Sequence, residues 1–480
     1  MAKKKKQVKI TPIGYSAQSV TGSCLLVEYL DHKILLECGG IQEMHTPLAN
    51  YKANKEQLSK IKPQEIDLVF IAHAHYDHIG LIPALCKNGK FQGRIIAPKG
   101  SSPILEEMWK DSAHIMERDC EYLSRKTGKI YLPFYDNTDI SIAMSHIDEY
   151  GQNEIYALDD NLSFRYTPSG HIFLGEQIEL FVTPAGHTFK ILYTSDLGNI
   201  TIQDEKFFVD HFSLVSKANI VIGESTYGGK GQKNKRKDYQ KDIEKIRSVI
   251  HQYCIDHSNR VLFPTFSLDR MPFMMWIIYS LFKDDPSFHV PVLIDSPLAI
   301  RLLNHYSSIL SGETKQRFDQ MMHWQYFKYI VESEDSQAAM KDSGAKIILS
   351  SGGMLQSGRS VQWAQNIIPR SGDCIVFSGY CGDGTLGYKI KHSKEQKTIT
   401  INHKVLSNRC QMAEITSLSG HMQHADLVNY YKSIRTDAIY LLHGSPESRA
   451  TLKEDLDAEI KKNYQTTKVK IINKSTVISL

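Results

Sequence analysis

The sequence predicts an α/β protein in which a parallel α/β unit interrupts a strand-rich domain. Three features support this prediction. Short apolar runs typical of strands dominate the first 215 residues, strands alternate with helical patterns from about residue 218, and short strands return after about residue 393. Alternating strands and helices favour a parallel sheet covered by helices. Periodicity favours the insertion of one unit within another without establishing it.

The first part of the chain contains five β-type runs, at residues 23–29, 33–37, 67–72, 178–183 and 189–194. The third run leads directly into a cluster of histidines. A turn that contains Pro184 and Gly186 separates the last two runs, and this arrangement predicts a β-hairpin.

The middle of the chain changes to an alternating pattern. Strands are predicted at residues 220–223, 261–264, 290–295, 346–350 and 374–378. Helices are predicted at residues 239–253, 271–282 and 297–306. Near the C-terminus, a predicted helix at 427–433 precedes a predicted strand at 438–442.

Composition limits the classes of protein and partner. The chain has 480 residues, of which 41% are hydrophobic and 23% charged, as in a globular protein with two or three structural units. The net charge is +4, and five lysines lie within the first nine residues, so the remainder is nearly neutral. A nucleic acid would therefore be bound by a local basic site and not by bulk charge.

Cysteine usage and hydropathy indicate a cytosolic protein. The 8 cysteines never form a CxxC pair, which argues against a disulfide scaffold and a four-cysteine zinc site. The charged N-terminus has no apolar segment of the signal-peptide type, and the most apolar run, residues 271–282, is too short to cross a bilayer. We therefore expect a cytoplasmic protein with no membrane partner.

The strongest chemical motif is the run His73-Ala-His75-Tyr-Asp77-His78, which directly follows the apolar residues 68–72. Imidazole and carboxylate groups are the ligands that Zn²⁺ takes in proteins. The first two histidines share one side of an extended segment, and the following Asp-His pair can face a second site as the chain turns. The motif therefore predicts a metal site.

This HxHxDH pattern, followed by Ile79-Gly80, resembles the signature of the metallo-β-lactamase superfamily. Further segments resemble its β-CASP branch of RNA- and DNA-processing nucleases, in the expected order and over nearly the whole chain. These segments are residues 166–175, 193–198, 224–228, 261–270, 295–299, 350–355, 418–421 and 442–444. The chain is most similar to the compact bacterial members with an RNA-specificity segment near the C-terminus.

The resemblance implies a fold and a domain organisation. The expected fold is a metallo-β-lactamase αββα sandwich with an inserted α/β β-CASP domain built on a parallel sheet. Residues 1–215 would form the first part of the sandwich and residues 216–395 the insert. Residues 396–480 would close the sandwich and carry the RNA-specificity segment.

The resemblance also implies two Zn²⁺ ions. One would be bound by His73, His75 and His171, and the other by Asp77, His78 and His421. Asp196 would bridge the two ions, together with a hydroxide. Two divalent ions about 3.5–4 Å apart can activate a water and clamp both oxygens of a phosphodiester displacement. Glu37, where the family usually has Asp, would orient a ligand imidazole.

Other histidines compete for these roles. His187 is expected in an exposed turn between two paired strands. His424 competes with His421, and the apolar face of the following helix favours His421 as the ligand. His443 follows an apolar strand, and two roles stay open for it: lining the phosphate path, or packing as a satisfied core histidine.

Proton transfer is the least settled part of the expected site. Glu224 matches the acidic motif A, whereas Lys389 stands where relatives have the motif B histidine. Lysine is a poor acid near neutral pH but can stabilise negative charge. Three roles stay open: electrostatic catalysis by Lys389, its replacement by His392, or a structural pair between Lys389 and Glu224.

Several residues are candidates for binding substrate. Ser351 and Gly352 lie in a small-residue turn after an apolar strand, where backbone N–H groups can approach a phosphate. Arg270 and Arg359 are candidate phosphate contacts, and the basic stretch 230–241 is either a solvated segment or a guide for a polyanion.

The resemblance implies an enzyme, a zinc-dependent ribonuclease that hydrolyses phosphodiester bonds of single-stranded RNA in RNA processing. A histidine at motif C favours RNA over DNA, because DNA-repair relatives typically lack a histidine ligand there. Two alternatives stay open: a DNA-directed hydrolase of the same fold, and a metal-binding RNA-recognition or assembly protein whose catalysis Lys389 weakens. Endonuclease against 5′-exonuclease action, and a homo-oligomer or protein partner, cannot be read from the sequence.

Overall fold

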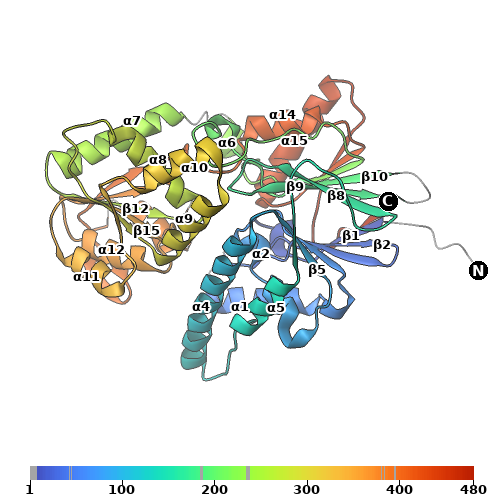
Figure 1. The fold of residues 1–480 in the computed structure, drawn as a ribbon, viewed down its shortest axis with the longest axis horizontal. Helices are drawn as coiled ribbons and strands as arrows, with labels where there is room; N and C mark the ends of the chain where they lie inside the picture. The colour runs from blue at the N-terminus through green and yellow to red at the C-terminus, as the bar shows by residue number, and fades with distance from the viewer. Residues whose placement is uncertain are drawn as a thin grey trace, which may run out of the picture. The chain divides into compact units, whose positions relative to one another are not determined.

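The computed structural model describes residues 8–42, 44, 46–183, 188–233, 238–379, 381–382, 384–393 and 396–479. The predictions that concern the first lysines, the 184–187 turn with His187, and part of the stretch 230–241 lie outside these residues. The chain divides into two compact units, which are described separately (Figure 1). Unit 1 comprises Met1–Lys235 with Gly420–Leu480, and unit 2 comprises Arg236–Ser419.

Unit 1 contains two mixed sheets of seven strands each. In the first sheet β1–β3 pair antiparallel and β3–β6 pair parallel. Its strands, in spatial order, are β22 (Ile478–Ser479), β1 (Val8–Pro12), β2 (Leu25–Tyr29), β3 (His32–Leu36), β4 (Leu68–Phe70), β5 (Arg94–Pro98) and β6 (Ile147–Tyr150).

The second sheet of unit 1 brings together distant parts of the chain. Its strands, in spatial order, are β21 (Lys468–Ile471), β20 (Ala438–Leu441), β11 (Ile220–Gly223), β10 (Phe189–Tyr193), β9 (Glu176–Val182), β8 (Leu162–Pro168) and β7 (Tyr156–Ala157). The strands β9 and β10 pair antiparallel with Val182 opposite Phe189, which confirms the predicted hairpin pairing.

The two sheets pack face to face because alternate residues of their strands are apolar. In β2, for example, Leu25, Val27 and Tyr29 are buried and the residues between them are partly exposed. They join Phe70 and Phe164 in one core between the sheets. The outer faces are covered by α1 (Pro47–Ser59), α4 (Ser102–Thr127) and α5 (Asn137–Ser145) on one side and by α14 (His424–Ser433) and α15 (Pro446–Lys462) on the other (Figure 1). This layering confirms the αββα sandwich.

Unit 2 is built on a six-stranded sheet in which every neighbouring pair is parallel. Its strands, in spatial order, are β14 (Phe327–Tyr329), β13 (Val292–Asp295), β15 (Lys346–Ser351), β12 (Arg260–Thr265), β16 (Cys374–Phe377) and β19 (Gln411–Glu414). Strands β17 (Thr398–Ile401) and β18 (Lys404–Ser407) form a separate hairpin. The parallel sheet of the predicted insert is therefore confirmed.

Helices connect the strands of unit 2, as parallel pairing requires. They are α7 (Tyr239–Ile250), α8 (Arg270–Phe282), α9 (Pro297–Ile309), α10 (Gly312–Met322), α11 (Ser333–Lys341), α12 (Arg359–Ile367) and α13 (Leu386–Lys391). Helix α8 is buried over most of its length, which explains why its sequence is the most apolar run of the chain.

Unit 2, Arg236–Ser419, begins and ends later in the chain than the predicted insert at residues 216–395. The sequence placed residues 220–223 in the insert, but this strand, β11, pairs in parallel with β10 and β20 and so completes a sheet of unit 1. At the other boundary, β19 pairs with β16 inside unit 2. The sequence of a short apolar strand does not show which sheet the strand joins. The boundaries of the compact units are therefore visible only in the structure.

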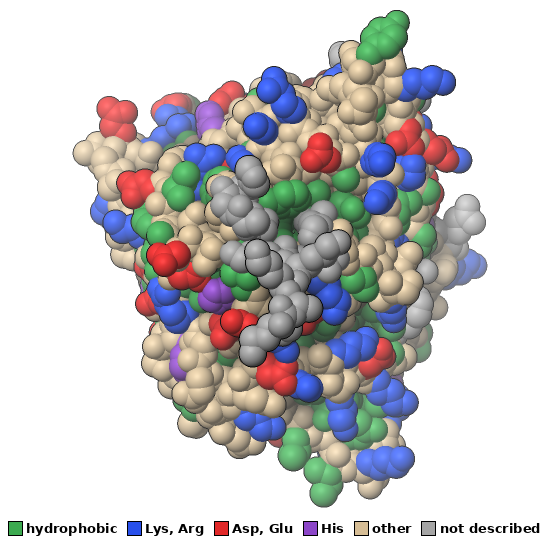
Figure 2. All heavy atoms as spheres, turned by 90° about the vertical axis from the view of Figure 1, so that its right-hand side faces the viewer, with side chains coloured by type: hydrophobic (Ala, Val, Ile, Leu, Met, Phe, Trp, Pro, Cys, Tyr) green, Lys and Arg blue, Asp and Glu red, His purple; other side chains and the backbone are tan. Residues whose placement is uncertain are grey.

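Surface charge and hydropathy agree with the composition. On the face drawn in Figure 2, basic and acidic side chains are interspersed and do not separate by sign. Among the described residues, no helix combines the length and apolar character that a membrane span needs.

Candidate metal centre

The candidate ligands of unit 1 lie on loops that follow its strands. The HxHxDH run follows β4 and enters the short helix α2 (Tyr76–Ile79). His171 lies in the loop between β8 and β9, Asp196 follows β10, and His443 follows β20. His421 precedes α14 and is positioned by a backbone bridge to Gly198.

A first group of donor atoms is formed by His73, His75, His171 and Asp196, whose ligand atoms all lie within 4.8 Å of one another. His73 Nε2 is 3.8 Å and His171 Nε2 3.6 Å from Asp196 Oδ2. Lys206 donates through Nζ to the backbone carbonyl of His171 at 2.8 Å and so supports its loop. Three imidazoles with one carboxylate are a common donor set for zinc.

A second group is formed by Asp77, His78 and His443, again with ligand atoms within 4.8 Å. His443 Nε2 is 3.5 Å from Asp77 Oδ2, and His443 Nδ1 is 3.2 Å from Asp196 Oδ1. His78 Nε2 is 3.4 Å from Asp196 Oδ2. The Asp196 carboxylate thus lies between the two groups: Oδ2 is near imidazoles of both, and Oδ1 is near His443.

A third group joins Asp196, Glu224 and His421. His421 Nδ1 is 3.4 Å from Glu224 Oε1 and 3.9 Å from Asp196 Oδ2. The Glu224 carboxylate accepts hydrogen bonds from the backbone N–H groups of Leu197 at 2.7 Å and Thr226 at 3.1 Å. The side chain of His421 is 23% exposed, against 5% for His443, so His421 is the more accessible of the two imidazoles.

Several buried polar atoms of these groups have no hydrogen-bond partner among the described residues. They are His78 Nε2, His171 Nδ1 and Nε2, His443 Nε2 and Asp196 Oδ1. A buried polar atom without a partner costs about 1–3 kcal/mol, so such a concentration needs a compensating ligand. Imidazole nitrogens and a carboxylate oxygen that converge in this way fit divalent metal ions of the zinc type.

Glu37 holds His78 in place. Glu37 Oε2 accepts hydrogen bonds from His78 Nδ1 and from the Tyr193 hydroxyl, each at 2.6 Å, and Oε1 accepts one from Ser195 Oγ at 2.9 Å. This contact leaves His78 Nε2 facing Asp77 and Asp196. The predicted orienting role is geometrically satisfied, because Tyr193 and Ser195 position the longer Glu side chain where a shorter Asp was expected.

The backbone of the site is strained at three of its residues. Glu37, Ser195 and His443 have φ values of 64°, 49° and 51°, in the left-handed region that non-glycine residues rarely adopt. Such strain persists only where the surrounding contacts determine the conformation, and it concentrates at functional sites.

The pKa values of the buried imidazoles shift in different directions, depending on which groups surround them. Burial lowers the pKa of His73 and of His171 well below the ordinary histidine value, and neighbouring imidazoles add to this effect. Burial also disfavours charge on His78, but the carboxylates of Glu37 and Asp196 outweigh it and raise its pKa well above that value. Neutral imidazoles are the form that binds metal.

Three known domain families match this chain. The metallo-beta-lactamase superfamily matches residues 19–161, the Beta-Casp domain residues 273–390, and the Zn-dependent metallo-hydrolase RNA specificity domain residues 406–467. The first match lies in unit 1, the second lies in unit 2, and the third includes the end of unit 2 and the part of unit 1 that follows it. The chain belongs to the β-CASP branch of the metallo-β-lactamase superfamily.

Characterised β-CASP relatives extend over nearly the whole chain. It is 25% identical to Ribonuclease TTHA0252 of Thermus thermophilus, over 93% of this chain and 95% of that protein. It is 25% identical to Cleavage and polyadenylation specificity factor 73 of Drosophila melanogaster, over 96% of this chain and 63% of that protein. It is 24% identical to Transcription termination factor FttA of Methanocaldococcus jannaschii, over 91% of this chain and 67% of that protein.

A solved structure shares the fold. A protein of unknown function from Enterococcus faecalis V583 superposes with a TM-score of 0.55 and 12% sequence identity, over 99% of this chain and all of that one. This likeness concerns the fold alone.

Of the competing histidines, His424 and His443 are described. His424 Nε2 is 2.8 Å from Asp455 Oδ2, and its Nδ1 faces the carbonyl of Tyr227 at 3.3 Å, so its imidazole is engaged away from the donor groups. His443 lies among the donor atoms, a place that sequence reasoning missed. The available signal was its position directly after a buried strand and before Gly444.

The β-CASP unit carries the remaining predicted residues. Lys389 is exposed on α13, and His392 follows that helix with Nδ1–H donating to the Tyr388 carbonyl at 2.8 Å. Glu224 belongs to unit 1 and Lys389 to unit 2, so their pairing stays a prediction. Gly352 has φ 104°, and a Cβ there would lie 2.4 Å from the Ser357 carbonyl oxygen, which explains the glycine.

The two candidate arginines have internal partners. Arg270 donates through Nη1 to the carbonyl of Ser378 at 2.9 Å. Arg359 donates to Asp295 Oδ1 at 2.6 Å and to the carbonyls of Ile330 and Val331 at 3.0 and 2.5 Å. Its guanidinium neutralises a fully buried carboxylate, and a phosphate contact at Arg359 stays a prediction.

Proposed function

We propose that this protein is a zinc-dependent ribonuclease that hydrolyses phosphodiester bonds of single-stranded RNA at a dinuclear site. The observation that carries the proposal is the Asp196 carboxylate, which lies between two groups of buried imidazoles and carboxylates. The RNA-specificity match and the relative named as a ribonuclease support RNA as the substrate.

The proposed ligand sets differ from the sequence expectation at one position. His73, His75 and His171 would hold one ion, and Asp77, His78 and His443 the other, with Asp196 shared. His443 replaces His421 because it lies with Asp77 and His78, and its Nε2 is buried without a hydrogen-bond partner among the described residues. When bound, two such ions lower the pKa of water and neutralise charge on a reacting phosphodiester.

His421 and Glu224 are proposed as the proton-transfer pair. Glu224 is fixed by two backbone N–H groups, and its Oε1 lies 3.4 Å from His421 Nδ1. A proton held on the imidazole by this carboxylate can be delivered from Nε2 to the leaving oxygen, which is general acid catalysis. The partial exposure of His421 is consistent with access to a substrate.

This assignment changes the role that is expected of Lys389. The hypothesis of weakened catalysis rested on the lack of a histidine to work beside Glu224, and His421 fills that place within unit 1. Lys389 is then proposed as an accessory positive charge for RNA, and His392 has no necessary proton role.

Cleavage of matched oligonucleotides tests the proposed function. End-labelled single strands of one sequence, as RNA and as DNA, are incubated with the zinc-loaded protein and the products are mapped. The proposal predicts faster cleavage of RNA, and faster cleavage of DNA would overturn it. Comparing 5′-triphosphate, 5′-monophosphate and 5′-hydroxyl RNA then separates endonuclease from 5′-exonuclease action.

A further inference from the structure

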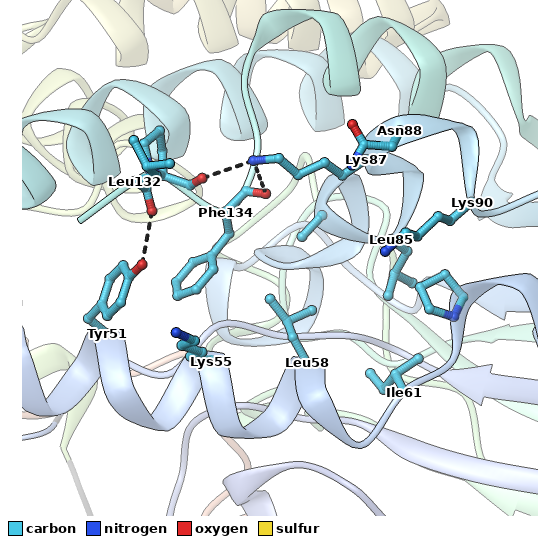
Figure 3. Close-up of a pocket in the computed structure, with 13 residues that line it drawn as sticks. Tyr51, Lys55, Leu58, Ile61, Leu85, Lys87, Asn88, Lys90, Leu132 and Phe134 are labelled. Atoms are coloured by element: carbon cyan, nitrogen blue, oxygen red, sulfur yellow. Dashed lines mark hydrogen bonds between the residues drawn. The ribbon is translucent and has the colours of Figure 1, made fainter. Parts of the chain in front are cut away.

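An open groove in unit 1 contains none of the metal-donor residues. Its volume is about 360 Å³. It lies between α1, the segment from α3 (Ile82–Cys86) to Lys90, and the loop before α5 (Figure 3). The lining residues are Tyr51, Lys55, Leu58, Ile61, Pro63, Ala84, Leu85, Lys87, Asn88, Lys90, Leu132, Pro133 and Phe134.

The groove is preformed by contacts between its walls. Tyr51 stacks on Phe134, with ring centroids 4.9 Å apart and an interplanar angle of 22°, and its hydroxyl donates to the Leu132 carbonyl at 3.2 Å. Lys87 Nζ donates to the carbonyls of Pro133 and Phe134, each at 3.2 Å (Figure 3). A ligand would therefore find the groove already shaped, which lowers the entropic cost of binding.

Helix α1, which forms one wall of the groove, is also fixed in place by hydrogen bonds of two buried side chains. Asn54 accepts a hydrogen bond from the Ile41 backbone N–H at 2.7 Å and donates to its carbonyl at 2.8 Å. Gln57 donates to the Gly39 carbonyl at 2.8 Å. Both side chains are buried, so α1 presents a rigid face to the groove.

The groove has a positive rim and an apolar floor. Three of its lining residues are lysines and none is acidic. Among the described residues, no acid forms an ion pair with Lys55 or Lys90, whereas Lys60, directly after α1 and outside the groove lining, pairs with Glu56 at 2.9 Å. Leu58, Ile61 and Leu85 supply aliphatic surface between these charges.

Apolar side chains are also exposed beside the groove. Leu132, in its lining, is 65% exposed, and Ile130, two residues earlier, is 87% exposed. Exposed apolar side chains gathered in one place, within a polar surround, are typical of a site where another protein binds.

We propose that this groove docks an acidic peptide segment of a partner protein, with a large apolar side chain of that segment inserted between α1 and Leu132. Carboxylates on either side of the anchor would pair with Lys55 and Lys90. This mode of recognition combines an apolar anchor with charge complementarity. It goes beyond the proposed nuclease function, because no lining residue is a metal donor or a proposed proton donor.

A peptide fits the lining better than a nucleic acid does. Single-stranded nucleic acids bind through open aromatic faces on which bases stack, usually with arginine nearby. Here the rings of Tyr51 and Phe134 stack on each other, the floor is aliphatic, and no arginine lines the groove.

A peptide selection on the full-length protein tests this proposal. A displayed library of random 12-residue peptides is selected against the wild type, and the enriched peptides are labelled for fluorescence anisotropy with each variant. The variants Lys55→Glu and Leu132→Ser change exposed side chains, so folding should be retained. Matched controls are Lys60→Glu, directly after α1 and outside the groove lining, and Ile155→Ser, another exposed apolar residue of unit 1.

The expected result is enrichment of peptides that combine Asp or Glu with a large apolar residue. Their affinity should fall at least tenfold in Lys55→Glu and in Leu132→Ser and stay within twofold in both controls, while RNA cleavage is unchanged in all four. No enrichment, enriched peptides without acids, or equal binding to the groove variants would overturn the proposal. A 12-nucleotide RNA that binds the wild type and loses affinity in the same variants would assign the groove to nucleic acid and also overturn it.

Discussion

Replacing Glu37 by glutamine tests how the site positions its ligands. The Glu37 carboxylate accepts three hydrogen bonds, from His78, Tyr193 and Ser195. A carboxamide keeps the shape but removes the charge, and only its oxygen can accept, so the donors that face its NH2 group lose their bond. Bonds to a charged acceptor contribute about 1.5–3 kcal/mol and bonds to a neutral one about 0.5–1.5 kcal/mol, so each affected bond loses about 1–1.5 kcal/mol.

Loss at the His78 bond alone corresponds to about a tenfold weaker metal affinity, because 1.4 kcal/mol is a factor of ten. Including the loss of orientation, we expect zinc affinity to fall about 10- to 100-fold in Glu37→Gln. Zinc affinity is measured by competition with a chromophoric chelator. The matched control is Glu176→Gln, a buried carboxyl of the same unit outside the donor groups. Unchanged zinc affinity in Glu37→Gln, or an equal loss in the control, would refute the reasoning.

Two further predictions concern stability, one for each unit. Burial raises the pKa of Glu176 well above its ordinary value, so the folded state binds more protons than the unfolded state and stability falls as pH rises above about 4.5. Glu176→Gln should flatten this fall in thermal unfolding between pH 5 and 8, and a slope equal to that of the wild type would contradict the assignment. In unit 2, Arg359→Ala leaves the buried Asp295 carboxylate without its cation and should cost about 3–5 kcal/mol in urea unfolding. The exposed Lys389→Ala serves as the control, with an expected change within about 0.5 kcal/mol, and a similarly small change in Arg359→Ala would contradict the structural role of Arg359.

The sequence could predict the parts of the site that lie close together in the chain. The HxHxDH run and the apolar strand before it place four donors without any knowledge of tertiary contacts. The parallel sheet of unit 2 is readable for the same reason, since each strand is followed by a helix that brings the chain back to the same edge.

The rest depends on contacts between distant residues. His421 and His443 both follow apolar segments near the C-terminus, and only the parallel pairing of β11 with β20 brings His443 close to Asp77. Arg359 presents the same problem, because its partner Asp295 lies at the end of a strand 64 residues earlier. A charged residue near a glycine-rich turn has the same sequence pattern whether it binds a phosphate or pairs with a buried carboxylate.

The zinc content of two single variants tests the central claim most directly. The full-length wild type, His443→Ala and His421→Ala are purified without chelator and analysed for metal per chain. The account predicts two zinc ions in the wild type, a loss of one in His443→Ala, and two ions with little RNA cleavage in His421→Ala. Full zinc in His443→Ala together with a loss in His421→Ala would contradict it and return His421 to the ligand set.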